Sequence, residues 1–310
     1  MKTKPHLPLL LLALLAALHF LLLAGSCPPA LTSPDAQGYF FPARLLAEEG
    51  TTTFRPATPL AYIGMHMLET GPGTFASRYP PGVALTAALP RLLFGAKASL
   101  LLTPLLASLT LLFLFLLCRP RVGPWPALVA AALFALHPLA DRHALNWGAH
   151  THATFFLLAG TWLLASLEYR PSMARAAGAG LLLGLVPAMR CAETAAGLGA
   201  AAFLLLLAGR GREYRRLLLP ALLGALPPLA LLMSYNLHHF GSPLATGYAL
   251  TGEQQLGSGF HWEFLAAKWA PYLTALMGSG MGLLLAPGLL GLAGMWARRR
   301  WTAVVMATGL

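Results

Sequence analysis

The sequence predicts an all-α protein built as a polytopic bundle of transmembrane helices. Hydrophobic residues make up 57% of the 310 positions and charged residues only 10%, whereas a soluble domain carries roughly 25% charged residues. Apolar runs long enough to cross ~30 Å of hydrocarbon as helices follow one another along the chain. The three cysteines are widely spaced, so we expect neither a disulfide framework nor a zinc site.

The apolar runs place eight membrane spans and the start of a ninth in one domain covering residues 1–310. We predict spans at 7–25, 97–118, 124–140, 149–167, 174–189, 191–209, 216–234 and 274–296, with a further run beginning at 301. The first run is long for a signal peptide and many spans follow it, which favours an uncleaved first span. Because the chain stops inside its last run, we expect it to be C-terminally incomplete.

The longest stretch too polar for the membrane is the loop 26–82, which holds four of the ten acidic residues. Within it, Ser33-Pro34-Asp35 precedes a run with helical spacing, 36–49, and predicts a helix along the membrane surface. The segment 83–95 that follows the loop has 13 residues and contains Pro90 and Arg91. It is too short and too polar to span, so we expect an interfacial or re-entrant helix.

The charge distribution orients the predicted spans and argues against a nucleic-acid partner. The net charge is +11, but the basic residues gather in short segments between apolar runs, where the positive-inside rule places them. If the N-terminus is cytoplasmic, 13 of the 21 Lys and Arg residues face the cytoplasm and eight of the ten acidic residues face outward. We therefore expect a multi-pass protein of the cell (inner) membrane with its active site on the periplasmic or extracellular side.

The loop 26–82 contains two candidate groups. Asp35 is either part of a helix cap or a catalytic carboxylate. Arg78 and Tyr79 precede Pro80-Pro81-Gly82, a turn whose prolines fix the backbone at the membrane surface. An arginine held there can bind a lipid phosphate through two parallel hydrogen bonds, and both side chains are equally typical of interfacial anchors.

The other outer segments supply the remaining candidates. Their polar side chains are Asp141, Arg142, His150, His152, Arg190, Glu193, Tyr235, Asn236, His239 and Tyr248. His150 and His152 are two residues apart and do not share a helix face, so we expect only one of them to face a pocket. Arg190 and Glu193 are three apart, and we expect them to pair with each other.

Several short patterns in this chain follow the order seen in one family. They are an acid after the first span, Tyr79-Pro80-Pro81-Gly82 before a short helix ending Leu93-Phe94-Gly95, Ala135-Leu136-His137-Pro138, Met189-Arg190-x-x-Glu193, and Tyr235-Asn236 followed by Phe240-Gly241-Ser242-Pro243-Leu244-x-Thr246-Gly247-Tyr248. In order and spacing the chain resembles bacterial multi-pass glycosyltransferases of the GT-C superfamily. The branch it resembles includes protein O-mannosyltransferases and the lipid A aminoarabinose transferase.

The resemblance implies a GT-C-like fold and a hexosyl- or pentosyltransferase. Such enzymes move a sugar, with inversion, from a polyprenyl-phosphate donor to a glycan, lipid or protein acceptor. By the same resemblance Asp35 is the base or a metal ligand, and Arg78 with Tyr79 holds the donor phosphate. Arg190 and His150 are further phosphate-binding candidates. A divalent metal ion is the one cofactor implied, with Asp35 and His150 as its ligands.

The sequence departs from the family pattern at two positions. Many relatives carry two adjacent acids in the first loop, whereas Ala36 follows Asp35 here. Relatives often carry an acid in the second outer loop, where this chain has His150. The second departure weakens an acid-based metal site.

The alternative function is a multi-pass transporter or lipid flippase, and a third is a scaffolding membrane subunit. Transporters place ionisable groups near the bilayer midplane, within repeated and broken helices. The predicted spans here are nearly free of charge and show no internal repeat. The polar residues gather outside the spans, which favours the transferase.

The predicted orientation can be tested by labelling. A cysteine introduced at Thr52 should react with a membrane-impermeant thiol reagent in intact cells, with any outer membrane permeabilised. A cysteine introduced near Arg212 should be protected, because the charge distribution places that segment in the cytoplasm. Protection at Thr52 together with labelling near Arg212 would reverse the topology.

Overall fold

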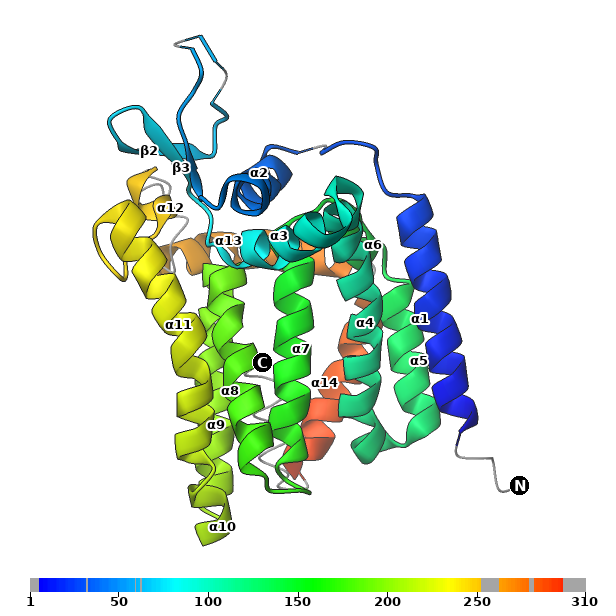
Figure 1. The fold of residues 1–310 in the computed structure, drawn as a ribbon. Helices are drawn as coiled ribbons and strands as arrows, with labels where there is room; N and C mark the ends of the chain where they lie inside the picture. The colour runs from blue at the N-terminus through cyan, green and yellow to red at the C-terminus, as the bar shows by residue number, and fades with distance from the viewer. Residues whose placement is uncertain are drawn as a thin grey trace.

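The computed structural model describes residues 6–31, 33–58, 60–61, 63–251, 262–278 and 282–297, and it confirms the predicted all-α fold class (Figure 1). The helices are α1 (Leu7–Gly25), α2 (Pro34–Glu49), α3 (Gly82–Phe94), α4 (Ala96–Val122), α5 (Pro124–Ala135), α6 (Pro138–Leu145), α7 (Ala149–Ser166), α8 (Met173–Met189), α9 (Ala196–Ala208), α10 (Arg212–Arg215), α11 (Leu218–Phe240), α12 (Gly247–Leu250), α13 (Trp262–Leu276) and α14 (Gly282–Ala297), with a 3₁₀ turn at Cys191–Ala195.

The longer helices stand side by side as a bundle. α4 packs against α1, α5 and α7, α7 packs against α8, and α8 packs against α11. Among the described residues, four helical stretches are long and apolar enough to cross a membrane: Leu7–Gly25, Ala96–Val122, Cys191–Ala208 and Arg212–Phe240. The α8–α11 contact is close because a side chain at Gly180 would overlap the Ala221 backbone, as is common where small residues line helix contacts in lipid.

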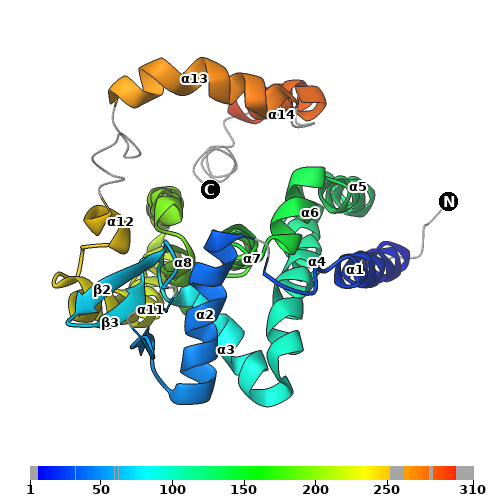
Figure 2. The same ribbon diagram turned by 90° about the horizontal axis from the view of Figure 1, so that it is seen from above.

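α2, α3 and a small sheet lie across one end of the bundle, which we call the loop end (Figures 1 and 2). α2 begins at Ser33, whose Oγ accepts a hydrogen bond from the Ala36 amide at 3.1 Å. It ends at Gly50, which adopts a left-handed conformation with φ of 68°. α3 packs against α2 on one side and α4 on the other.

The three-stranded sheet in the first loop was not predicted. Strands β1 (Thr53–Phe54), β2 (Met67–Gly71) and β3 (Thr74–Ser77) pair antiparallel in the order β1-β3-β2. Strands of two to five residues are too short to show a clear alternation of polar and apolar side chains in the sequence.

Three predicted spans differ most from the observed helices. The span 124–140 is wrong beyond Ala135, because Pro138 disfavours helical backbone at His137, which is extended with φ of −83° and ψ of 114°. The span 216–234 is too short, since α11 continues to Phe240. The span 274–296 falls on parts of two described helices, because residues 274–276 belong to α13 and 282–296 to α14. The run predicted from 301 lies outside the described residues.

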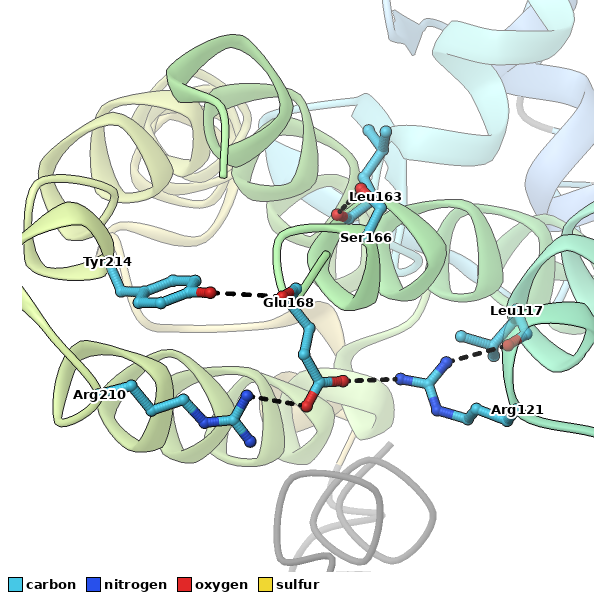
Figure 3. Close-up of polar contacts among 7 residues, drawn as sticks. All are labelled: Leu117, Arg121, Leu163, Ser166, Glu168, Arg210 and Tyr214. Carbon is cyan, nitrogen blue, oxygen red and sulfur yellow. Dashed lines mark hydrogen bonds and ion pairs between the residues drawn. The ribbon is translucent and has the colours of Figure 1, made fainter. Parts of the chain in front are cut away.

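The opposite end of the bundle, which we call the arginine end, carries Arg119, Arg121, Arg170, Arg175, Arg210, Arg212, Arg215 and Arg216 (Figure 1). Glu168, in the turn between α7 and α8, joins three segments there (Figure 3). Its carboxylate contacts Arg121 at 3.5 Å and Arg210 at 3.0 Å, and its carbonyl accepts a hydrogen bond from Tyr214 at 3.3 Å. The Glu168 side chain is only 16% exposed. These contacts tie the ends of α4 and α9 to the α7–α8 turn.

Candidate functional site

Six of the predicted site residues line one cavity of about 230 Å³, which we call the loop-end cavity. They are Asp35, Arg78, Tyr79, His150, Arg190 and Tyr248. α2 supplies the acid, the turn after β3 supplies the Arg-Tyr pair, and α7, the end of α8 and α12 supply the others. Segments far apart in the chain therefore bring one carboxylate and two guanidinium groups to a single cavity.

The Tyr79 hydroxyl lies at the centre of a chain of hydrogen bonds. It donates to Asp35 Oδ1 at 2.5 Å and accepts from Arg78 Nη2 at 3.3 Å. His66 Nε2 lies 3.0 Å from the same carboxylate oxygen. Burial raises the pKa of Tyr79, and the hydrogen bond to Asp35 raises it further, so the hydroxyl stays protonated at neutral pH. The Asp35 side chain is 60% exposed, which leaves its carboxylate held in place but accessible.

The Tyr79 ring is held by close packing against α2. It stacks on Tyr39 with ring centroids 4.2 Å apart and an interplanar angle of 19°. A Cβ atom at Gly38 would lie 2.5 Å from the Tyr79 ring, so only glycine permits this approach. The hydroxyl consequently reaches Asp35 from a fixed ring position.

Two aromatic rings hold the Arg78 guanidinium beside the cavity. Its Cζ lies 5.2 Å from the centroid of Tyr79 and 5.3 Å from that of Tyr248, within the range of cation–π attraction. Arg78 is only 8% exposed. A guanidinium in such a low-dielectric position interacts more strongly with an anion than one in water.

The predicted pairing of Arg190 with Glu193 is confirmed: the Arg190 guanidinium donates to the Glu193 carboxylate. Arg190 also lines the loop-end cavity, whereas Glu193 lines a separate apolar cavity between α8, α9 and α11. Arg190 is therefore a second cation at the loop-end cavity, and Glu193 partly neutralises its charge.

The expectation that one of His150 and His152 faces a pocket is confirmed. His150 lines the loop-end cavity, and its ring centroid lies 4.1 Å from that of His143. His152 is fully buried between Thr86 and Thr103, at 3.2 Å from each hydroxyl. Burial lowers the pKa of His143, as do the charges of Arg142 and Arg190, so this ring is neutral at pH 7.

The remaining predicted residues do not line the loop-end cavity. Asp141 lies 3.1 Å from His19 of α1, and Arg142 lies beside it on α6. Tyr235 donates to the Ser77 carbonyl at 3.4 Å, Asn236 Nδ2 to the Pro243 carbonyl at 3.2 Å, and His239 Nε2 lies 3.0 Å from the Thr52 hydroxyl. These three residues brace α11 against the loop end.

Three residues of the site were missed in the sequence: Tyr39 and Asn146, which line the cavity beside His143, and His66, which contacts Asp35. Tyr39 was detectable, since it follows Asp35 by one helical turn on α2. His66 lies just before β2, in a loop whose sequence shows no periodic pattern, and nothing in its sequence context indicates the contact.

The predicted metal ligands do not complete a metal-binding group. The described part of the chain holds no cluster of three His, Cys, Asp or Glu side chains suited to a metal ion. Asp35 and His150 line the same cavity, but a zinc site normally has at least three protein ligands. These two residues do not form a metal site made by protein ligands alone, and the divalent metal ion stays a prediction.

An apolar cavity of about 450 Å³ adjoins the polar one. It lies between α4, α5, α6 and α7, and its walls include Ala107, Leu114, Leu133 and Phe134. His143 and His150 line both cavities. An anionic group and an apolar chain belonging to one ligand can therefore occupy neighbouring spaces.

Solved structures of similar fold include two of an oligosaccharyltransferase from Archaeoglobus fulgidus. One is the crystal structure of the Archaeoglobus fulgidus oligosaccharyltransferase in the apo form, with a TM-score of 0.55, 16% identity and 92% of this chain covered. The other is the oligosaccharyltransferase AglB of Archaeoglobus fulgidus in complex with an inhibitory peptide and a dolichol-phosphate, with a TM-score of 0.51, 18% identity and 98% covered. The chain spans 38% and 39% of their lengths. No family model and no curated protein matches the chain.

The comparisons establish the fold class. The chain has the same type of helical fold as these oligosaccharyltransferases. The resemblance to GT-C glycosyltransferases, and to their O-mannosyltransferase and aminoarabinose transferase branch, stays a prediction.

The contact between Gly38 and Tyr79 can be tested through stability. Gly38→Ala should lower the free energy of unfolding by about 1–3 kcal/mol, because the added methyl group overpacks a rigid ring. The measurement is the denaturation midpoint of the purified protein in detergent. The control is Gly197→Ala in α9, where nothing lies within 4 Å of the added atom and where alanine favours the helix. Equal midpoints for the two variants would refute the close packing.

Proposed function

We propose that the chain is an integral membrane glycosyltransferase that takes a hexosyl or pentosyl group from a polyprenyl-phosphate donor. Transfer proceeds with inversion to an acceptor on the outer face of the cell membrane. The observation that supports this most strongly is the juxtaposition of a carboxylate and two guanidinium groups on a polar cavity that adjoins an apolar one. A donor with an anionic head and a lipid tail matches both spaces.

Arg78 is the proposed binder of the donor phosphate. Its buried guanidinium lies beside two aromatic rings, and the fork of an arginine matches phosphate oxygens through paired hydrogen bonds. As the sugar–phosphate bond breaks, negative charge grows on the leaving phosphate. A cation already fixed in a low-dielectric site stabilises that charge without reorganising. Arg190 adds a second positive group to the same cavity.

Asp35 is the proposed general base for the acceptor hydroxyl. Its carboxylate is exposed at the cavity, and the contacts from Tyr79 and His66 both fall on Oδ1. We therefore assign proton transfer to Oδ2. The position of Asp35 in the first turn of α2 also suits a carboxylate, because the N-terminal end of a helix carries partial positive charge.

The lipid part of the donor is proposed to enter the apolar cavity between α4 and α7. The path from the polar cavity passes His143 and His150, which line both spaces. The complex of AglB with a dolichol-phosphate and a peptide supports a lipid-phosphate donor for this fold and makes a peptide one candidate acceptor class. A glycan or a lipid is the other candidate acceptor, and any acceptor must present a nucleophilic hydroxyl or amide group.

Asp35→Asn separates catalysis from structure. The change keeps the shape of the side chain and removes only its charge and basicity, while the Ser33 cap of α2 is untouched. Loss of a general base typically lowers the rate by ~10²–10⁴-fold. Transfer from a panel of polyprenyl-phosphate hexoses and pentoses should fall by that factor in Asp35→Asn. The control Glu49→Gln, at the exposed end of α2, should leave it unchanged. Transfer within a few-fold of wild type in Asp35→Asn would refute the assignment.

Arg78 is tested by two substitutions. Arg78→Ala should lower the turnover by ~10²–10³-fold, as expected for the loss of a group that stabilises transition-state charge. Arg78→Lys keeps the charge but loses the planar fork, so it should retain part of the activity. The matched control is Arg55→Ala, because Arg55 is exposed and bonds only Thr74 at 3.1 Å in the described part of the chain. If the turnover of Arg78→Ala equalled that of the wild type, Arg78 would not bind the donor phosphate and would serve only as an interfacial anchor.

A further inference from the structure

The arginine end of the bundle contains a cavity of about 580 Å³ that the proposed transfer does not use. Its lining comes from the α4–α5 hairpin and the α7–α8 hairpin. The turns of these hairpins lie at the opposite end of the bundle from α2 and α3 (Figure 1). Gly123, with φ of 89°, and Pro124 form the first of these turns. The cavity is therefore shaped by two helical hairpins rather than by a mobile loop.

Four arginines line this cavity: Arg119, Arg121, Arg170 and Arg175. Arg121 contacts Glu168 and donates to the Leu117 carbonyl at 3.0 Å (Figure 3). The Glu168 carboxylate is shared with Arg210, so one acid serves two cations. Within the ranges that the structure describes, Arg119, Arg170 and Arg175 form no ion pair with an acidic side chain. In the described part of the chain, the four arginines of the cavity are thus opposed by one shared acid, Glu168.

The same cavity has an apolar wall made by Leu116, Trp162 and Ala165. These residues belong to the last two turns of α4 and α7. A soluble phosphate compound would gain nothing from such a wall. The positive-inside rule explains arginines at this end, but it requires neither a cavity nor their convergence from two hairpins.

We propose that this cavity binds the headgroup of an anionic diacyl phospholipid. The phosphate is held by Arg119, Arg170 and Arg175. The parts of the acyl chains nearest the headgroup lie along Leu116 and Trp162. Basic pockets between helices at the cytoplasmic side of membrane proteins are suited to such headgroups. The bound lipid would offset the repulsion among the arginines and fasten the α4–α5 hairpin to the α7–α8 hairpin. The inference is independent of the sugar-transfer reaction.

Lipid binding can be measured on the purified full chain by native mass spectrometry in detergent, with added phosphatidylglycerol or phosphatidylcholine. Wild-type protein should retain phosphatidylglycerol in preference to phosphatidylcholine. Arg119→Gln/Arg175→Gln should bind phosphatidylglycerol about 30-fold more weakly, since each arginine near an anionic lipid surface contributes on the order of a five-fold factor. The control Arg212→Gln/Arg216→Gln removes equal charge at the same end but outside the cavity. It should bind like wild type.

Three results would overturn the proposal. One is unchanged phosphatidylglycerol binding in Arg119→Gln/Arg175→Gln, and another is an equal loss in the control, which would indicate general surface charge. The third is displacement of the lipid by millimolar inorganic phosphate, which would assign the cavity to a soluble anion. Because the glutamine variant can fail to fold, Arg119→Lys/Arg175→Lys is measured beside it. This variant keeps the charge and should still prefer phosphatidylglycerol, with weaker retention through loss of the paired hydrogen bonds.

Discussion

The contact of Tyr79 with α2 is the interaction on which the candidate site depends. The ring fits against Gly38 and stacks on Tyr39, and this fixes the hydroxyl between Asp35 and Arg78. An acidic side chain from α2 and a basic side chain from the turn after β3 are thereby held at fixed positions relative to each other. The Pro80-Pro81 turn that follows leads directly into α3, so the same residues set the path by which the first loop returns to the bundle.

The bilayer imposes the second constraint, since polar groups within a helix bundle need internal partners. His19 meets this requirement through Ser108 at 2.9 Å and Asp141 at 3.1 Å, and His152 does so through two threonines. Charged groups are consequently concentrated at the two ends. The loop end places its cations beside a carboxylate in a small cavity, whereas the arginine end gathers cations around one shared acid. The two ends suit different anionic ligands.

The sequence predicted the helical fold class and most of the candidate site, because both leave local signals. Apolar runs mark the helices, and a polar loop that interrupts them marks the site region. Prediction from the sequence failed where the structure depends on contacts between residues that are distant in sequence. The short strands and the loop residue His66, which contacts Asp35, have no periodic pattern of their own. Asp141 and His239 look like site residues in sequence, yet they serve packing, because only the fold decides which way each side chain faces.

A structure of the protein with a bound polyprenyl phosphate tests the central claim most directly. The account predicts a phosphate in the loop-end cavity at a hydrogen-bonding distance of about 3 Å from the Arg78 guanidinium. The first isoprene units should run past His143 and His150 into the apolar cavity between α4 and α7. A phosphate bound away from Arg78, or a lipid chain that leaves the apolar cavity empty, would contradict the account.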